Sequence, residues 1–492
     1  MTITSEQLTP WQRRLIPGLT ELLFVLLFLP QLDARLFSAG TGLHLWAGLE
    51  ALRHGLGPLP DTLSFTRQGA PWSNLEWLGD VILALAWRRA AYPGVAVLCA
   101  LVFAGTFTWL YRILVDETGQ PAVSLIVALL AAAVAHLHLL ARPSTLALPL
   151  LLAAWELTRK PRPGWAAFAL PAVTALWANL HPSVLVVPLL AVYAALTHSR
   201  SPRSWIIAVL CLAALSATPT GAAWLVDVIP SRADLAFMRG IEEWRPPMPS
   251  DLRFLAVWIY AVLALLARRA GAPLGKAEGL LGLGILAASL LAARMAPLAG
   301  IVWAPALARD LANHARQAKG APGVVLTALQ ETLGPFERVF RPGLWPALLG
   351  VGAILAAPYL GAFLPGVERG FSAANFPVGA VAAAADLDLG PRVFNEYRWG
   401  DYLSWVGRGR WQVFVDARVG LYSGSVLADY RTIAGMRPGW EGALARYRPD
   451  WMLLRRGAPL IRGAADSGRW RVAYRDSMAA ILTPVPVSGP AR

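Results

Sequence analysis

The chain is poor in cysteine and in charge. Its 492 residues include two cysteines, Cys99 and Cys211, and both lie inside apolar stretches. This excludes a disulfide framework and a zinc site built on paired cysteines. Charged residues make up 15% of the chain and hydrophobic residues 56%, whereas soluble proteins are about one quarter charged. The composition therefore excludes a disordered, a fibrous or a purely soluble protein.

The common motifs of soluble enzymes are also missing. The sequence has no Walker loop, no Gly-x-Ser-x-Gly elbow, no His-Glu-x-x-His motif and no dinucleotide fingerprint. Nucleotide-driven transport and serine hydrolysis are therefore disfavoured. His136 and His138 do not suggest a shared metal site, because side chains two positions apart on a helix point in different directions.

Long apolar runs separate the polar segments of the chain. Several approach the ~20 apolar residues that cross a bilayer as a helix. The candidate spans are residues 15–32, 75–87, 94–112, 121–139, 144–158, 165–180, 183–198, 204–218, 252–267, 277–293, 297–308 and 344–363. Some of these are short, so a re-entrant segment or a broken pair is an alternative for them. We predict an α-helical polytopic membrane protein with about 11–13 transmembrane helices.

The charge that is present is mostly arginine. Basic residues number 44 against 30 acidic ones, which gives a net charge of +14, and only three of the basic residues are lysine. Pairs such as Arg88-Arg89 punctuate the apolar runs, as expected for inner loops of a membrane protein. We therefore predict no nucleic-acid partner, and we place the N-terminus on the inner side.

Two loops and the C-terminal part interrupt this pattern. The first outer loop, 33–74, is far longer than a typical connection, and its segment 42–54 is predicted as an interfacial helix. A second outer loop spans 218–251. After the membrane module, 1–365, residues 366–492 alternate strand and helix patterns, which predicts a small soluble α/β domain. The predicted strands are 392–395, 412–416, 450–454, 469–473 and 479–483, with helices at 425–433 and 440–447.

The first outer loop and its edges hold the densest set of acids. Glu76 and Asp80 are four apart at the start of a predicted helix, so they share one face. Such a pair suits general-base work, metal binding or binding of a sugar hydroxyl. The alternative is structural, with Asn74 capping the helix and Glu76 complementing its dipole. Asp33 follows the first apolar run, where it is either a base for a membrane-borne substrate or an ordinary charge at a helix end.

Basic groups are predicted near the same surface. Arg245 and Arg294 lie at predicted outer helix ends, where a guanidinium suits a phosphate, although arginines also extend to membrane edges for structural reasons. His181 lies at an interruption between two apolar runs. It is either a residue that lines a site or an ordinary histidine at the membrane interface.

In residue pattern and order, the chain resembles the GT-C superfamily of polyprenyl-phosphate-sugar-dependent glycosyltransferases. The resemblance covers most of the chain. It rests on His44-Leu45, Pro60-Asp61-Thr62, Gly69-Ala70-Pro71-Trp72, Glu76-Trp77-Leu78, Arg142-Pro143, Asn179-Leu180-His181, Glu243-Trp244-Arg245, Arg294, the segment from Phe394 to Leu403, and Val415-Asp416-Ala417-Arg418.

The resemblance implies an inverting glycosyltransferase of the bacterial inner membrane. It would move a sugar from a polyprenyl-phosphate donor to a lipid, glycan or protein acceptor at the outer face, with the C-terminal domain extracytoplasmic. Asp33 is then the candidate base and the candidate ligand of a divalent metal, Mg²⁺ or Mn²⁺. The other implied site residues are the supporting acids Asp61 and Glu76 and the substrate-binding residues His44, Arg67, Trp72, His181, Glu243, Arg245 and Arg294.

One departure from the family pattern keeps other functions open. Relatives have an acidic and aromatic cluster directly before the His-Leu pair, whereas this chain has Gly40-Thr41-Gly42-Leu43. A scaffold or assembly subunit, with a protein partner on the C-terminal domain, is one alternative. A lipid or glycan transporter is another, which the scarcity of charges deep in the apolar runs disfavours. In each case membrane lipids are the predicted surroundings.

Overall fold

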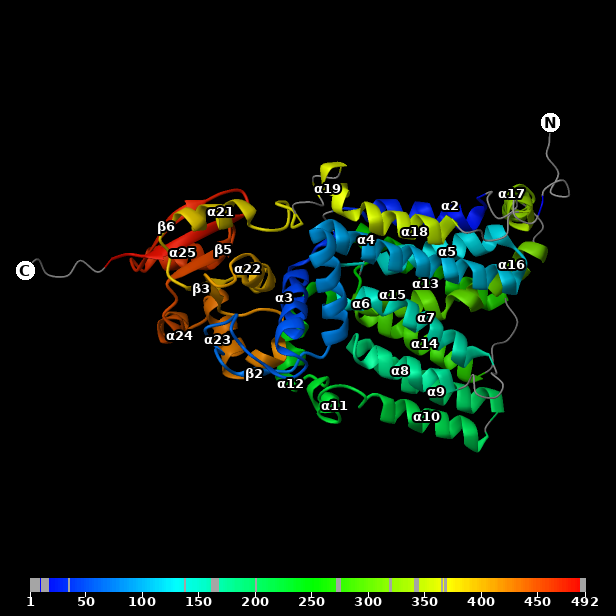
Figure 1. Ribbon diagram of the computed structural model, residues 1–492, viewed down its shortest axis with the longest axis horizontal. Helices are drawn as coiled ribbons and strands as arrows, with labels where there is room; N and C mark the ends of the chain where they lie inside the picture. Colours follow the sequence, from blue (N-terminus) through cyan, green and yellow to red (C-terminus); the bar gives the residue numbers. More distant parts are fainter. Residues whose placement is uncertain are drawn as a thin grey trace, which may run out of the picture.

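The computed structural model describes residues 9, 17–33, 36–136, 139–160, 168–199, 201–270, 276–317, 321–339, 345–363, 366 and 370–486. A bundle of helices and a smaller α/β domain lie at opposite ends of the molecule, and helix α3 (Ala39–His54) lies between them (Figure 1). The prediction of a helical protein with a small C-terminal α/β domain is confirmed. Of His136 and His138, which the sequence does not favour as a shared metal site, His138 lies outside the described residues.

The apolar segments form the bundle, and each predicted span contains helix. The segments are α2 (Leu19–Phe28), η2 (Leu29–Gln31), α4 (Trp77–Thr118), α5 (Pro121–His136), α6 (Pro143–Leu146), α7 (Leu148–Arg159), α8 (Ala169–Ala178), η5 (Pro182–Leu185), α9 (Val186–Ala194), η6 (Ala195–Ser199), α10 (Pro202–Ala214), η8 (Leu252–Phe254), α13 (Leu255–Ala270), α14 (Lys276–Leu291), η9 (Ala293–Met295), α15 (Ala296–Val302), α16 (Ala304–Gln317), α17 (Ala321–Val339), α18 (Trp345–Ala356), η10 (Ala357–Tyr359) and α19 (Leu360–Phe363). The apolar pattern does not predict α17, because its mixed sequence includes the polar pair Gln330-Glu331.

The predicted spans 75–87 and 94–112 are two arms of one helix. α4 is 42 residues long and has non-helical backbone at Ala90 and Ala91, where φ of Ala91 is +45°. The first arm packs on α3 so closely that a Cβ on Gly48 would lie 2.1 Å from the carbonyl oxygen of Asp80. Arg88, near the end of this arm, lines the same cleft as Arg408 of the C-terminal domain. The sequence-based placement of Arg88-Arg89 and this domain on opposite sides of the membrane is therefore wrong.

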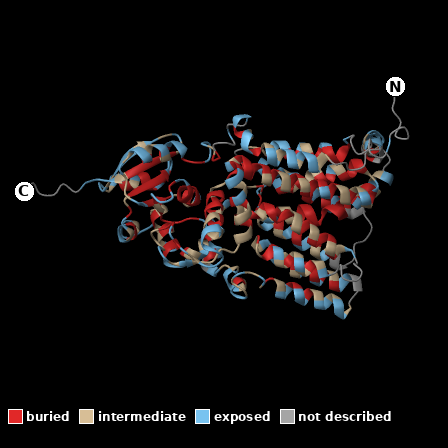
Figure 2. Ribbon diagram, viewed as in Figure 1, coloured by how far each residue is buried: buried red, intermediate tan, exposed pale blue. Residues whose placement is uncertain are grey.

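Exposed residues cover the outer helices of the bundle (Figure 2), and many of them are large and apolar. Leu22, Val209 and Leu355 are each about 60% exposed, at 59%, 62% and 60%. In the described part of the C-terminal domain, by contrast, no large apolar side chain exceeds 40%. Water disfavours such a belt and lipid does not, so the bundle has the surface of a membrane-embedded body.

By length and composition alone, fewer helices are able to cross a membrane than the sequence analysis predicts. Among the described residues, α4 and the segment Trp345–Phe363 are long and apolar enough to cross a membrane, and the other apolar helices are shorter. The number of crossings therefore stays a prediction.

The C-terminal domain is built on a five-stranded sheet within the described residues, in the order β4-β3-β5-β7-β6. β3 runs parallel to β4 and β5, while β7 is antiparallel to β5 and β6. All five predicted strands and both predicted helices are confirmed to within a few residues. The elements are α21 (Val378–Asp386), β3 (Arg392–Asn395), η11 (Tyr397–Trp399), α22 (Gly400–Val406), β4 (Gln412–Val413), η12 (Val419–Tyr422), α23 (Ser425–Ala434), α24 (Trp440–Tyr447), β5 (Trp451–Arg455), α25 (Pro459–Asp466), β6 (Trp470–Arg475) and β7 (Ala479–Pro484).

Both predicted outer loops pack on this domain. The first loop contains α3, β1 (Leu59–Pro60) and β2 (Pro71–Trp72), and its Ser64 forms a parallel bridge to Val413 at the edge of the sheet. The second loop contains the short helices α11 (Ala223–Asp227), α12 (Arg232–Met238) and η7 (Glu242–Trp244). Phe237 of α12 enters the aromatic core of the domain beside Tyr397 and Tyr430. The two loops thereby connect the bundle to the domain.

The contact between α3 and α22 requires glycine, and this makes a testable prediction. A Cβ on Gly42 would lie 2.6 Å from Cβ of Trp405 and 2.8 Å from the carbonyl oxygen of Asp401. We expect Gly42→Ala to lower stability by about 1–3 kcal/mol, since one of the two helices must move. The measurement is thermal unfolding in detergent. Gly105→Ala is the control, because its Cβ would meet nothing within 4 Å. An equal loss in both variants would contradict this view of the contact.

Candidate active site

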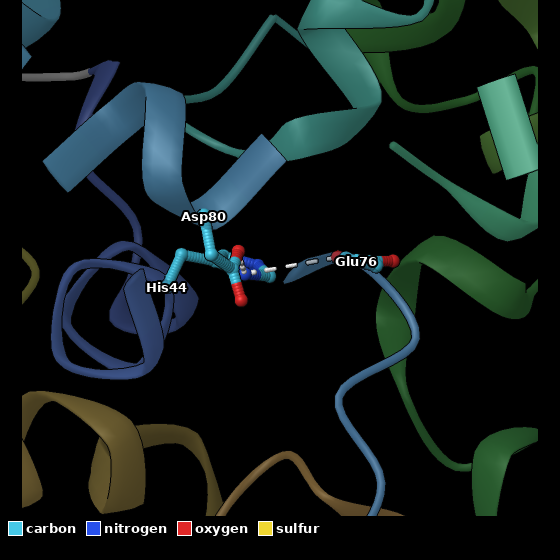
Figure 3. A group of neighbouring side chains, drawn as sticks. All are labelled: His44, Glu76 and Asp80. Atoms are coloured by element: carbon cyan, nitrogen blue, oxygen red, sulfur yellow. Dashed lines mark hydrogen bonds and ion pairs between the residues drawn. The ribbon is translucent and has the colours of Figure 1, made fainter. Parts of the chain in front are cut away.

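His44, Glu76 and Asp80 form a compact group where α3 meets the start of α4. Nδ1 of His44 lies 2.7 Å from Oδ1 of Asp80 and 3.7 Å from Oε2 of Glu76. Figure 3 shows the imidazole of His44 directed at Asp80, with Glu76 on the other side. One potential ligand atom from each of the three side chains lies within 4.8 Å of the others. The carboxylate pair that helical spacing predicts is therefore joined by a histidine from another helix.

The side chain of Asn74 orients the two acidic residues. The amide of Asn74 donates to Oδ2 of Asp80 at 2.8 Å, and its carbonyl oxygen accepts from the backbone N–H of Glu76 at 3.1 Å. Glu76 is the residue immediately before α4. Trp77 anchors this helix start on the end of α8, because its indole N–H donates to the side chain of Asn179 at 2.7 Å. Asn74 thus orients both acidic residues, but the predicted helix cap at Asn74 is wrong, because α4 begins at Trp77 with Glu76 as its N-cap residue.

His181 joins the group from the end of the α8 segment. Its Nε2 lies 3.5 Å from Oε1 of Glu76. Its Nδ1 accepts a hydrogen bond from the backbone N–H of Ser183 at 3.1 Å, so the neutral imidazole carries its proton on Nε2. Burial and the positive charge of Arg294 lower the pKa of His181 to about 3. This histidine is therefore a neutral donor directed at Glu76.

The surroundings also set the charge state of the group. Burial raises the pKa of Glu76 to about 7, against the opposing effect of His44. Burial alone would lower the pKa of His44, but the charge of Asp80 and its hydrogen bond raise the value above the ordinary one. Burial thus favours the protonated form of Glu76, and Asp80 favours the charged form of His44.

Two arginines border the group, and one carboxylate links them. Nη1 of Arg142 and Nη1 of Arg294 lie 3.5 and 3.6 Å from the two carboxylate oxygens of Glu243. The guanidinium of Arg294 also stacks on Trp244, 4.3 Å from the ring centroid. Nε of Arg142 donates to the hydroxyl of Ser38 at 2.8 Å. The positive charge of both arginines reaches Glu76 and His181.

Three of these side chains lie where helices begin or are interrupted. Arg142 precedes α6, His181 precedes η5, and Arg294 lies in η9. A peptide hydrogen bond of 3.0 Å from Ala293 to Arg245 fixes the second outer loop against this end of the bundle. Residues from six separate segments therefore meet on the side of the bundle that faces the C-terminal domain.

Asp61, Arg67 and Trp72 lie at the junction of loop and domain instead. Asp61 is 1% exposed, and its carboxylate accepts from the hydroxyl of Ser64 at 2.5 Å and from Nη2 of Arg418 at 2.7 Å. Arg67 donates to the carbonyl oxygen of Ser423 at 3.0 Å. The ring of Trp72 lies 5.3 Å from the guanidinium of Arg418. These contacts hold the loop to the domain, and the catalytic and substrate-binding roles predicted for the three residues stay predictions.

Asp33 and Arg245 are not members of the group His44, Glu76 and Asp80. Asp33 is partly buried and follows η2, and it is not in the group of potential metal ligands found among the described residues. The adjoining Leu36 accepts a hydrogen bond from the backbone N–H of Ala141, one residue before Arg142. Arg245 is exposed and donates to the carbonyl oxygen of Gly240 at 2.8 Å. The catalytic role predicted for Asp33 and the substrate-binding role predicted for Arg245 stay predictions.

The group fits a divalent metal in its donor chemistry. One imidazole and two carboxylates suit a divalent transition-metal ion, manganese included, better than magnesium, which prefers oxygen ligands alone. Asn74 and His181 would hold the carboxylates in place, as outer partners of metal ligands do. If a metal binds, the tentative assignment to Asp33 is thus less well supported than this group.

Comparisons with known proteins show a distant likeness in fold. No protein-family model matches the sequence, and no curated protein matches it. ArnT from Cupriavidus metallidurans bound to undecaprenyl phosphate is similar over 96% of this chain and 99% of that chain, with a TM-score of 0.47 and 13% identity. ArnT in the apo state gives a TM-score of 0.49 and 14% identity over 94% and 97% of the two chains. At these TM-scores, neither a substrate nor a site follows from the likeness.

Proposed function

We propose that this protein is a membrane glycosyltransferase that takes a sugar from a polyprenyl-phosphate donor. The observation that carries the proposal is the meeting of Glu76 and His44 with Arg142 and Arg294 beside an apolar bundle. The reaction needs a carboxylate for the acceptor and cations for the departing phosphate. The sequence resemblance to the GT-C superfamily implies the same chemistry.

The chain's own residues account for the charge movements of the transfer. Glu76, or Asp33 from the adjoining loop, takes the proton of the acceptor hydroxyl. The acceptor oxygen forms a bond to the anomeric carbon while the bond from that carbon to the phosphate oxygen breaks, and the electron pair stays on the phosphate. Arg142 and Arg294 exchange their long contacts to Glu243 for contacts to this phosphate. The sugar is thereby transferred with inversion.

A divalent ion, where present, would be held by His44, Glu76 and Asp80 and would supply a Lewis acid beside the phosphate. His181 would keep Glu76 oriented in either case, because its Nε2–H faces this carboxylate.

The glycines that depart from the family pattern have a packing role. Gly42 lies against Trp405 and Asp401, and a Cβ on Gly40 would lie 3.0 Å from Nε of Arg142. Larger residues there would separate α3 from α22 and displace Arg142. The departure is thus compatible with catalysis and does not by itself favour a scaffold.

Binding of undecaprenyl phosphate to the full chain in nanodiscs tests the proposal. We expect Arg142→Gln and Arg294→Gln each to weaken binding about tenfold or more, since each removes a charged hydrogen bond to phosphate. Arg253→Gln is the matched control, because Arg253 pairs with Asp251 and Glu242 in the second loop. Unchanged binding in both site variants would contradict the assignment of the phosphate to this site.

A further inference from the structure

A second charged cleft lies between α3, the first arm of α4 and the end of α22. Its volume is about 640 Å³. Three arginines and three tryptophans line it, namely Arg53, Arg88, Arg408, Trp46, Trp87 and Trp405.

The cleft is separate from the candidate active site. His44 and Arg53 are nine positions apart on α3, which is two and a half helical turns, so they point to opposite sides of the helix. The cleft lies on the side of Arg53, whereas His44 points at Asp80.

Positive charge exceeds negative charge in the cleft. The one acid that lines it, Glu50, pairs with Arg53 at 3.0 Å and with His54 at 3.1 Å. Arg88 and Arg408 are exposed, and neither has a carboxylate partner among the described residues. Two guanidinium groups are therefore left without a counter-charge in one concave site, which is what an anion requires.

The tryptophans hold one of these guanidinium groups in place. Arg408 stacks on Trp405, 4.0 Å from the ring centroid, and donates to the carbonyl oxygen of Trp405 at 3.2 Å. The ring of Trp405 is itself fixed by a 2.8 Å hydrogen bond to the hydroxyl of Tyr92 and by an edge contact with Trp87. A stacked guanidinium keeps its remaining N–H groups in one plane, which suits the oxygens of a phosphate.

The position of the cleft along α4 indicates where its ligand would lie. Arg88 comes two residues before the kink at Ala90 and Ala91, and the apolar second arm begins directly after it. Tryptophan is enriched in the headgroup layer of a membrane, and arginine extends its charged end to that layer. The cleft is thus at the boundary between the apolar bundle and the polar domain.

We propose that this cleft binds a phosphate group, carried either by an anionic lipid headgroup or by a free phosphate compound. Arg88 and Arg408 are its ligands, and Trp405 holds Arg408 in position.

Thermal unfolding of the full chain in detergent micelles tests this site. The probes are phosphatidylglycerol, the zwitterionic phosphatidylcholine and inorganic pyrophosphate, each added over a range of concentrations. The double variant Arg88→Gln/Arg408→Gln is compared with Arg89→Gln, because Arg89 is exposed and does not line the cleft. The quantity compared is the rise in melting temperature on addition of each probe, so a change in basal stability does not affect the result.

We expect an anionic probe to raise the melting temperature of the wild type and of Arg89→Gln at a concentration at least tenfold lower than for the double variant. A response to phosphatidylglycerol alone identifies a lipid headgroup as the source of the phosphate, and a response to pyrophosphate identifies a free compound. Equal responses to phosphatidylglycerol and phosphatidylcholine, with none to pyrophosphate, would overturn the proposal. So would a double variant that responds like the wild type. Because a phosphate at Arg142 and Arg294 would add a response in every protein, the three proteins are also compared in an Arg142→Gln/Arg294→Gln background.

Discussion

Replacing Glu76 by glutamine is expected to lower sugar transfer from a polyprenyl-phosphate donor by at least about 100-fold, the usual contribution of a positioned acid or base. Glutamine keeps the size of the side chain and a carbonyl oxygen for Nε2–H of His181, but it neither takes a proton nor binds a metal as a carboxylate does. The measurement is transfer of labelled sugar by the full chain in lipid vesicles. Asp33→Asn, assayed alongside, separates the two candidate bases.

Two further observations make the Glu76 result decisive. Glu441→Gln is the control, since Glu441 lies in the C-terminal domain and pairs with the exposed Arg469. Titration with Mn²⁺ distinguishes the roles of Glu76, because excess ion restores a weakened metal ligand and does not restore a lost base. A wild-type rate of sugar transfer by Glu76→Gln would contradict the proposed role of this group. A wild-type rate by Asp33→Asn would exclude Asp33 as the base.

Removing the guanidinium of Arg418 is expected to cause the largest loss of stability. Arg418 is 5% exposed, and its Nη2 lies 2.7 Å from Asp61 and 2.6 Å from Asp416. Arg418→Met would leave two carboxylates buried without a counter-charge, and breaking such a pair costs about 3–5 kcal/mol. Thermal or denaturant unfolding, followed by tryptophan fluorescence, measures the change.

An exposed ion pair in the same domain provides the comparison. Arg446 lies 2.7 Å from Asp429, but its side chain is 62% exposed, so Arg446→Met is expected to cost no more than about 1 kcal/mol. Adding Asp61→Asn to Arg418→Met should recover part of the loss, because one buried charge disappears with it. A loss in Arg418→Met no greater than in Arg446→Met would show that the buried cluster does not hold the loop to the domain.

Local patterns were enough to predict the elements of the C-terminal domain. The strand Arg392–Asn395 and the helix Trp440–Tyr447 are found with the predicted bounds, because alternation with period 2 and apolar spacing with period 3.6 depend on near neighbours alone. The order of the strands did not follow from those patterns. It depends on which strand edges meet, and the sequence by itself does not specify this.

The candidate site divides in the same way. That Glu76 and Asp80 share a face follows from helical spacing, and the structure shows them together. The other side chains of the site come from distant parts of the sequence. His44 reaches Asp80 across 36 positions, and Glu243 reaches Arg142 and Arg294 from a loop that local patterns leave undefined. In the sequence, Arg142 stood out through the Arg142-Pro143 pair of the family resemblance, and nothing local connected it with the acids.

The sequence by itself determined that the chain is an apolar helical bundle with a polar C-terminal domain, because composition and hydrophobic period are local properties that decide which segments avoid water. Only the tertiary structure decided that the first arm of α4 packs on α3 beside the domain, that Asp61 lies 2.7 Å from Arg418, and that Arg88 shares a cleft with Arg408. Each of these depends on contacts between distant segments. These contacts are stabilised by close packing and by the pairing of buried charges, and neither is apparent from the order of residues alone.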